Sequence, residues 1–368
     1  MTTHETADEI VRQDVALIGR QASSELDALA GRNVLLTGGG GFLGYTLVHV
    51  LADIGRQDGR EPVQLTIYEN FSRGRKPWLE QFAGRPNVTL VHHDITKPLP
   101  DDVPRFDYII HAASIASPIF YRQFPIETID ANVNGLRHLL DYAKQAGERG
   151  APVAGMLFFS TSEIYGDPSP DAIPTAETYR GFVSCTGPRA CYDESKRLGE
   201  TLCVNFAAQH GVRVATARPF NNYGPGLAIN DRRILPDLVR NVLNREDIVL
   251  LSDGRATRTF CYVADAVAGY LKILVKGQPG EPYNIGTEVP EVSMRDLAER
   301  VVEQGARLFG YTGRVTFQRS DDPAYLTDNP NRRCPDITKA RTALGYAPEV
   351  DLSEGLRRSL IWYKENAA

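Results

Sequence analysis

Cysteine is scarce in this sequence, and its spacing excludes the usual cysteine-based sites. The five cysteines among 368 residues lie at positions 185, 191, 203, 261 and 334, an odd number without a C-x-x-C pair. This pattern favours free thiols in a reducing compartment over a disulfide framework or a zinc site. The expected location is therefore the cytoplasm, and no bound metal is expected.

Long apolar runs and an excess of basic residues are also missing. No stretch approaches the roughly eighteen consecutive apolar residues of a membrane-spanning helix, and the first residues lack the basic and apolar regions of a signal peptide. The formal net charge of −5 is not that of a typical nucleic-acid-binding protein. We therefore expect no membrane and no nucleic-acid partner. The length suits one large α/β domain with a smaller one.

What the sequence does contain is an alternation of apolar strand and helix patterns. Helical stretches are expected at 42–54, 132–145 and 192–210. Strand candidates lie at 34–37, 63–68, 88–91, 108–111, 155–160 and 212–218. This alternation predicts an α/β fold of the Rossmann type, a doubly wound parallel sheet with helices on both faces, and a smaller, mostly C-terminal lobe.

A glycine-rich turn joins the first expected strand to the first long helix. Gly38, Gly41 and Gly44 are three residues apart, and Phe42 and Leu43 open the helix. Glycine permits the tight turn and the close approach of a pyrophosphate, which then faces the free N–H groups of the helix N-terminus. A strand before the turn and a helix after it are the context in which this motif predicts a dinucleotide site.

The second expected strand ends at Glu69, whose carboxylate would accept hydrogen bonds from the adenosine ribose and repel a 2′-phosphate. This favours NAD over NADP, although Arg73, Arg75 and Lys76 follow closely and weaken the argument. Asp94 is expected to contact the adenine or to cap a surface turn. The other expected cofactor contacts follow strand ends: Asn70, Ile95, Ala112 and Ala113.

The domain boundaries follow from these patterns. Residues 1–30 form an amphipathic N-terminal helical extension, expected to serve packing or oligomer contacts without chemistry. Residues 31–219 form the NAD-binding domain, to which 255–280 are expected to return. Residues 220–254 and 281–368 form the smaller lobe, which is expected to bind substrate.

One tyrosine has a lysine four residues later, namely Tyr192 with Lys196. Positions i and i+4 share a helix face, so the phenol and the ammonium would flank the same bound ribose, and both count as cofactor contacts. A nearby cation lowers the pKa of a tyrosine from about 10 and favours the phenolate. Tyr192 is therefore the expected catalytic base.

With these motifs the chain resembles the extended short-chain dehydrogenase/reductase superfamily, and within it the UDP-glucuronic acid decarboxylases. The resemblance runs from about residue 31 to the C-terminus. The segments 160–168 and 187–197 are its most specific part, and the glycine turn is shared across the superfamily. The matching segments are 37–44, 113–118, 160–168, 187–197 and 333–337.

The resemblance implies an NAD-dependent decarboxylation of UDP-glucuronate to UDP-xylose through a 4-keto sugar. Related dehydratases carry Asp-Glu after the strand-end threonine, whereas this chain has Ser162-Glu163 after Thr161. Tyr192 would take the C4 hydroxyl proton while Ser162 or Thr161 positions that hydroxyl. Glu163 and Arg258 match residues that orient the sugar carboxylate and help to protonate C5.

The resemblance also implies a set of substrate contacts. Tyr121 matches a position near the sugar carboxylate, and Asn221 and Arg333 match positions that bind the diphosphate. The full expected set is Ser117, Tyr121, Glu163, Asn221, Arg258 and Arg333. A homodimer is implied, formed by helices around 132–145 and 192–210.

Three departures from the family pattern lie near the presumed substrate. Ile115 stands where proline is usual, Gly226 replaces an arginine, and 324–331 resemble an insertion. They leave open a 4-epimerase, a 4,6-dehydratase or a UDP-apiose-type synthase on the same fold, or a non-catalytic NAD-binding sensor. The intact Ser–Tyr–Lys set argues against the sensor.

Overall fold

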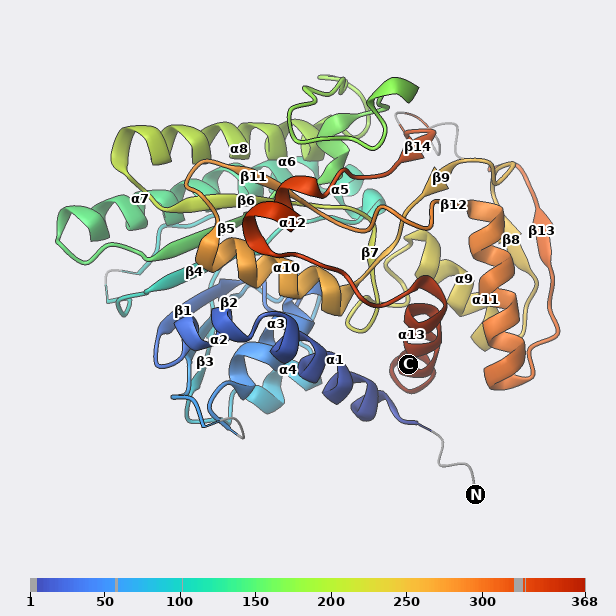
Figure 1. Cartoon of the computed structure of the whole chain (residues 1–368), viewed down its shortest axis with the longest axis horizontal. Helices are drawn as coiled ribbons and strands as arrows, with labels where there is room; N and C mark the ends of the chain where they lie inside the picture. The colour runs from blue at the N-terminus through green and yellow to red at the C-terminus, as the bar shows by residue number, and fades with distance from the viewer. Residues whose placement is uncertain (1–4, 57–58, 101, 321–326, 328, 368) are drawn as a thin grey trace.

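The computed structural model describes residues 5–56, 59–100, 102–320, 327 and 329–367. Its centre is a seven-stranded parallel sheet with the order β11-β6-β5-β4-β1-β2-β3, so the strand order reverses beside β1 as in a Rossmann fold (Figure 1). The strands of this sheet are β1 (Asn33–Thr37), β2 (Gln64–Glu69), β3 (Val88–His92), β4 (Tyr108–His111), β5 (Gly155–Phe159), β6 (Val214–Pro219) and β11 (Pro282–Ile285). The expected fold class is confirmed.

Helices cover both faces of this sheet. The α7 and α8 layer lies on one face, and α3 and α10 lie on the other (Figure 1). The helical elements up to β6 are α1 (Ala7–Gln21), α2 (Ser23–Leu29), α3 (Phe42–Asp53), α4 (Pro77–Phe82), α5 (Pro118–Gln123), α6 (Pro125–Asp130), the π-helical turn η1 (Ala131–Gly135), α7 (Leu136–Glu148), the 3₁₀ turns η2 (Ser162–Tyr165) and η3 (Pro170–Ala172), and α8 (Ala190–His210).

Alternation along the strands divides the core into two layers. Leu35 and Phe158 point into the cluster beneath α7 and α8. Leu36 and Leu157 point into the larger cluster with α3 and α10. Successive side chains of a strand face opposite sides, so a sheet buried on both faces needs apolar residues at nearly every position. That need explains the continuous apolar runs in the sequence.

The N-terminal extension consists of two helices, as expected. A capping box between Thr6 and Glu9 starts α1, and α1 packs against α3, α10 and the C-terminal helix. Ile10 and Ile18 of α1 are fully buried. The extension thus joins the large domain to the smaller lobe.

The smaller lobe is built from helices and short strands. Arg258 of β9 lies directly beside Arg333 of β14 in the register of a three-stranded sheet. The elements after β6 are β7 (Asn222–Tyr223), α9 (Ile234–Asn244), β8 (Ile248–Leu250), β9 (Thr257–Arg258), β10 (Cys261–Tyr262), α10 (Val263–Lys276), β12 (Val292–Ser293), α11 (Met294–Phe309), β13 (Val315–Phe317), β14 (Arg332–Arg333), α12 (Thr338–Leu344) and α13 (Leu352–Asn366).

The course of the chain differs from the expected boundaries at two places. Residues 282–285, expected in the smaller lobe, form β11 and pair with β6 at the edge of the main sheet. Within 255–280, α10 packs on the main sheet, but β9 belongs to the small sheet with β12 and β14. Strand pairing depends on distant partners, so the local pattern did not reveal either assignment.

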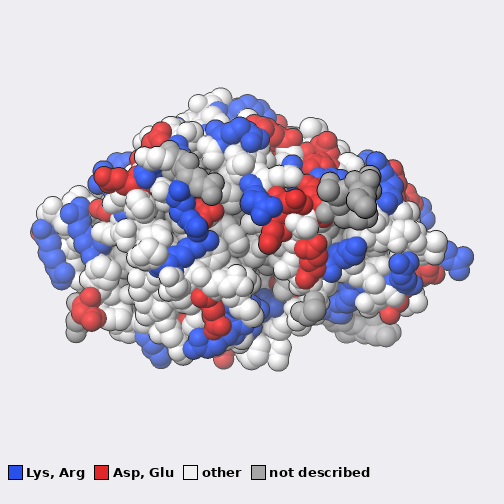
Figure 2. Space-filling view, turned by 90° about the horizontal axis from the view of Figure 1, so that it is seen from below, with Lys and Arg blue, Asp and Glu red and all other residues white. Residues whose placement is uncertain are grey.

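Two further observations concern the surface. Figure 2 shows basic and acidic side chains interspersed over the face seen from below. Among the described residues, no helix combines the length and apolar character needed to span a bilayer.

Candidate active site

The carboxyl ends of the central strands meet along one edge of the sheet, where ligands bind in doubly wound folds. There the glycine turn after β1 is tightly constrained. Gly38 has φ +72°, and a Cβ on it would lie 2.6 Å from the Cα of Ala113. A Cβ on Gly44 would lie 2.4 Å from the carbonyl oxygen of Gly39. Only glycine fits here, and α3 begins at Phe42 without a side-chain cap, so its first N–H groups remain available for a phosphate.

Glu69 ends β2 beside this turn. Its Oε2 accepts from the N–H of Gly40 at 2.8 Å, so the carboxylate is held at the glycine turn. Two of the three basic residues that follow have acidic partners: Arg73 lies 3.4 Å from Asp231 and Arg75 lies 3.1 Å from Glu80. These ion pairs weaken the case for a 2′-phosphate site and favour NAD.

The remaining expected cofactor contacts lie around the same edge. Asn70 accepts from the N–H of Ser72, Asp94 accepts from the N–H of Thr96, and Ile95 is buried. The N–H groups of Ala112 and Ala113 donate to Thr37. Asp94 therefore caps a turn, which is one of the two roles expected for it.

Tyr192 and Lys196 occupy one face of α8 and are both buried. The Lys196 ammonium lies 5.8 Å from the Tyr192 ring centroid and donates to the carbonyl of Phe159 at 2.7 Å. Burial lowers the pKa of Lys196 to about 7. The expected phenol–ammonium pair is therefore assembled at the end of β5.

The expectation of a lowered tyrosine pKa is reversed in this structure. Burial raises the pKa of Tyr192 to about 12, although a hydrogen bond with Thr161 and the charge of Arg233 act in the opposite direction. The cost of burying a phenolate outweighs the nearby positive charges. The sequence pattern identified the cation but not the depth of burial.

A buried hydrogen-bond chain, which the sequence did not indicate, supports α8. The side-chain amide of Asn132 donates to Ser195 Oγ at 2.9 Å, and Ser195 donates to the carbonyl of Tyr192. Asn132 lies in the π-helical turn η1, and such turns occur frequently at functional sites. This turn, within the stretch expected as an ordinary helix, holds the tyrosine-bearing segment in place.

Glu163 is the centre of a buried ion cluster next to Tyr192. Arg333 donates to both of its oxygens, at 2.7 and 2.5 Å, and Arg189 forms a further ion pair with it. Burial alone would raise the pKa of Glu163, but the two guanidinium groups hold it at about 2. Glu163 is therefore ionised at neutral pH.

In the part of the chain that the structure describes, no hydrogen bond or ion pair joins Glu163 to Arg258, the two residues expected together at the sugar carboxylate, although the charge of Arg258 acts on Glu163. The Arg258 guanidinium donates instead to main-chain carbonyls of Thr257, Pro330 and Asn331. Burial and the neighbouring Arg333 lower its pKa to about 9. Arg333, expected at the diphosphate, takes the place beside Glu163, and among the described residues Arg258 has no ion pair.

Two members of the cluster were missed as site residues. Arg189 precedes α8, and its Nε lies 3.6 Å from Oδ2 of Asp193, one turn further along. Asp193 is only 5% exposed, and no described residue forms a hydrogen bond with its Oδ1. The i, i+4 spacing of these opposite charges is the signal that would have indicated the pair.

The other expected substrate residues differ in whether their polar side-chain atoms already have hydrogen-bond partners within the protein. The Tyr121 ring stacks on Tyr192 with 5.1 Å between centroids, and its buried hydroxyl has no described partner. By contrast, Ser117 donates to the carbonyl of Asp231, and Asn221 donates to the carbonyl of Thr259. Tyr121 thus keeps a polar atom for a ligand, whereas Ser117 and Asn221 hold loops together.

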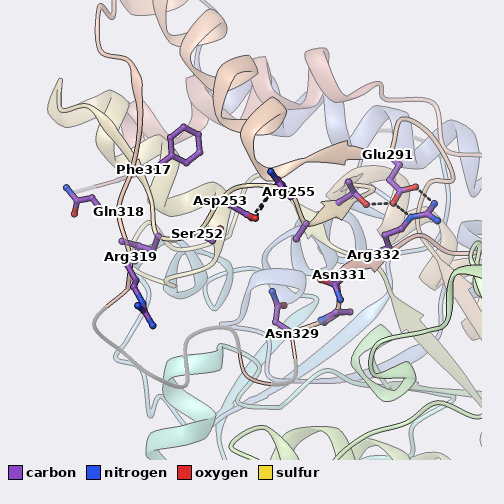
Figure 3. A pocket seen from close by; sticks show the side chains of 14 residues that line it. Ser252, Asp253, Arg255, Glu291, Phe317, Gln318, Arg319, Asn329, Asn331 and Arg332 are labelled. Atoms are coloured by element: carbon purple, nitrogen blue, oxygen red, sulfur yellow. Dashed lines mark hydrogen bonds and ion pairs between the residues drawn. The ribbon is translucent and has the colours of Figure 1, made fainter.

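Next to this cluster the smaller lobe contains a cavity of about 1160 Å³. It lies between the ends of β8 and β13 on one side and β14 on the other, with Arg255, Gln318, Arg319 and Asn329 around it (Figure 3). Tyr192 and Glu163 are not among its lining residues. Thr257 and Asn331, which bond Arg258, line it and connect it to the ion cluster. Part of the expected insertion, 324–326 and 328, lies outside the described residues.

Comparison with known proteins places this site in a family. The model of the NAD dependent epimerase/dehydratase family matches residues 34–286. The chain belongs to that family. It is 38% identical to UDP-glucuronic acid decarboxylase 1 of Xenopus tropicalis, over 91% of this chain and 72% of that protein. It is 39% identical to UDP-glucuronic acid decarboxylase 5 of Arabidopsis thaliana, over 88% of this chain and 86% of that protein.

Solved structures of similar proteins agree with the fold. An epimerase from Methanothermobacter thermautotrophicus aligns with a TM-score of 0.77 and 26% identity, covering 95% of this chain and 96% of that one. A dTDP-glucose 4,6-dehydratase from Streptomyces venezuelae, solved with NAD bound, aligns with a TM-score of 0.76 and 25% identity, covering 90% and 97%. The expected superfamily and the similarity to UDP-glucuronic acid decarboxylases are confirmed.

Proposed function

We propose that this protein is an NAD-dependent decarboxylase that converts UDP-glucuronate to UDP-xylose through a 4-keto sugar. The observation that carries the proposal is the excess of guanidinium groups beside Tyr192. Arg189, Arg258 and Arg333 lie around Glu163, and Arg258 has no ion pair among the described residues. A buried excess of positive charge favours anionic groups, and the diphosphate and the sugar carboxylate of UDP-glucuronate supply them. The decarboxylase relatives support the same reaction.

The residues of the glycine turn, Glu69 and the Tyr192–Lys196 pair fit NAD. When bound there, NAD supplies the hydride acceptor for the C4 position of the sugar. Tyr192 takes the proton of the C4 hydroxyl, which Thr161 or Ser162 positions, once the positive charge of a bound nicotinamide offsets the burial that raises the pKa of this tyrosine. The new ketone lies β to the C5 carboxylate. The bond to the carboxylate therefore breaks with its electrons entering an enolate, and carbon dioxide leaves. Protonation of C5 gives the 4-keto-pentose, and return of the hydride to C4, with a proton to its oxygen from Tyr192, would give UDP-xylose and leave NAD oxidised again.

The ion cluster orients the carboxylate for this step. Glu163 is ionised at neutral pH and fixes Arg333 and Arg189 by charge-assisted hydrogen bonds and ion pairs. Arg258, next to the cavity, is placed for the diphosphate of a UDP-sugar, with the nucleoside in the cavity itself. This assignment exchanges the roles that the sequence suggested for Arg258 and Arg333.

One incubation tests the proposal. The purified protein with NAD and UDP-glucuronate should release carbon dioxide and give UDP-xylose, identified by mass and NMR. Release before the final reduction would give a UDP-4-keto-pentose and consume NAD. A branched pentose would identify an apiose-type synthase. An unchanged carboxylate with inverted C4 would identify an epimerase, and no conversion of any UDP-sugar would overturn an enzymatic function.

We further propose that the protein is a cytoplasmic homodimer. Exposed apolar side chains gather on α6 and α8, which contact each other: Ile126 is 63% exposed and Leu198 47%. Phe124 and Ile129 extend the same helical region. The charge substitution Ile126→Glu should halve the mass measured by light scattering, and a monomeric parent protein would contradict the proposal. The five free cysteines suit a reducing compartment.

A further inference from the structure

Asp193 is a buried acid for which the proposed reaction has no use. It lies in the first turn of α8, directly after Tyr192, and is 5% exposed. No described residue forms a hydrogen bond with its Oδ1, and none forms one with Nε of Arg189. A buried ion pair separated by 3.6 Å without a hydrogen bond recovers little of its desolvation cost. Both Asp193 and Arg189 therefore keep a polar atom without a hydrogen bond to a described residue.

Arg189 is shared between two acids. Its NH2 group forms the tight ion pair with Glu163, and its Nε faces Asp193. The cluster contains three guanidinium groups and two carboxylates. It therefore carries one excess positive charge when Asp193 is ionised and two when Asp193 is protonated.

We infer that Asp193 competes with the carboxylate of an acidic sugar for Arg189 and so makes the affinity for that sugar depend on pH. This inference rests on the part of the proposed function that gives the site a UDP-sugar with a carboxylate, and it does not require turnover of that sugar. Asp193 acts through Arg189 and is a positioning residue.

The surroundings of Asp193 fix the direction of the effect. The groups facing it are Tyr121 from α5, Glu163 from η2, Arg189, Cys191 and Tyr192 at the start of α8, and Arg333 from β14. Burial, together with the charge of Glu163, raises the pKa of Asp193 to about 7, although Arg189 and Arg333 lower it. A bound anion would raise this pKa further, so binding takes up a proton. Affinity for the acidic sugar should be highest below pH 7 and fall as the pH rises.

The test compares two ligands in the full-length protein with NAD, in a Tyr192→Phe background that prevents turnover. Calorimetry should show UDP-glucuronate binding about fivefold more weakly at pH 8 than at pH 6, whereas UDP-glucose should change by less than about twofold. Burial lowers the pKa of Lys196 to about 7 as well, and the UDP-glucose arm removes that contribution.

Variants assign the effect. Asp193→Asn should bind UDP-glucuronate equally at both pH values and more tightly than its parent at pH 8. Asp193→Glu should keep the dependence. Glu194→Gln, which removes a partly exposed charge one residue away, should follow the parent. A pH dependence that persists in Asp193→Asn, or that is equal for UDP-glucose, would overturn the inference.

A second measurement needs no Asp193 variant. At pH 7.5, calorimetry in two buffers of different ionisation enthalpy should show proton uptake on binding UDP-glucuronate and none on binding UDP-glucose. Equal uptake for both ligands would contradict the inference even if Asp193→Asn fails to fold. Normal binding without any conversion by the unsubstituted protein would refute the proposed function and leave this inference standing. No binding of UDP-glucuronate would overturn both.

Discussion

Asp14 and Asp193 are both buried, and burial is the main reason that each has a pKa raised to about 7. They differ in their partners. Both oxygens of Asp14 are bonded, one to the Tyr262 hydroxyl at 2.7 Å and one to Arg358 at 2.8 Å. Asp193 has a single loose contact with Arg189.

This difference in partners distinguishes a structural ion pair, here called the clamp, from a ligand-binding site. Asp14 lies on α1 and Arg358 on α13, so this pair fastens the N-terminal extension to the smaller lobe. Around Asp193 and Glu163 the charges are unbalanced, and an anion would complete them. A buried charge whose hydrogen bonds are all made serves stability, whereas one left partly unpaired beside a ligand edge indicates function.

The largest expected effect lies at the site. Tyr192→Phe should lower kcat about a thousandfold, within the range that general acid–base groups contribute. The melting temperature should hardly change, because the phenylalanine ring keeps the stack on Tyr121. Steady-state kinetics and thermal unfolding of the same preparation measure both. Turnover at the parent rate would remove Tyr192 from the mechanism.

The opposite outcome is expected at the clamp. Asp14→Ala should lower the free energy of unfolding by about 3 kcal/mol, because it leaves the Tyr262 hydroxyl and Arg358 with a lost buried partner. The kcat should be unchanged at temperatures where the variant is folded. Denaturant titration measures the loss of stability. A fall in kcat without a loss of stability would contradict the structural role assigned to Asp14.

The same residue has a pH signature. Because its pKa is higher in the folded protein than the ordinary value of 3.8, ionisation of Asp14 costs stability as the pH rises through about 7. Asp14→Asn should therefore reduce the decline in stability between pH 5 and pH 8. An unchanged slope would mean that other groups cause the decline.

A fourth prediction tests the exchange of the two arginines. Arg333→Lys should lower kcat/KM about a hundredfold, because an ammonium cannot make the bidentate contact with Glu163. Arg258→Lys should act mainly on the KM for UDP-glucuronate. The reverse pattern would restore the roles that the sequence suggested.

These arginines also mark the limit of prediction from sequence. The glycine turn and the Tyr192–Lys196 pair depend on contacts within a turn or a helix, and a local sequence pattern can indicate such contacts. Arg258 and Arg333 are neighbours in register on β9 and β14, so both reach the same place. Which one turns towards Glu163 depends on the carbonyls of Pro330 and Asn331, which bond Arg258. No local pattern contains that information.

The strands of the fold also differ in whether a local sequence pattern could indicate them. The six strands up to β6 were recognisable because each is an apolar run next to a turn. The seventh, β11, is not a continuous apolar run, because Pro282 and Asn284 alternate with Tyr283 and Ile285, and its place in the sheet comes from pairing with β6. The pKa of Tyr192 likewise depends on burial beneath Tyr121, a residue far away in sequence.

The smallest effect is expected at the exposed end of the clamp. Arg357 bonds Glu354 at 2.7 Å and pairs with Glu5, but its side chain is 30% exposed, against 15% for Arg358. Solvent already stabilises these charges, so Arg357→Gln should cost less than about 1 kcal/mol.

The neighbouring position provides the control. Arg358→Gln should cost about as much as Asp14→Ala, and the double variant should cost much less than the sum of the two, because both remove one buried pair. Denaturant titrations of the four proteins measure this coupling. Equal losses at Arg357 and Arg358 would mean that the bond lengths, which are similar at the two positions, determine the stability and that burial does not.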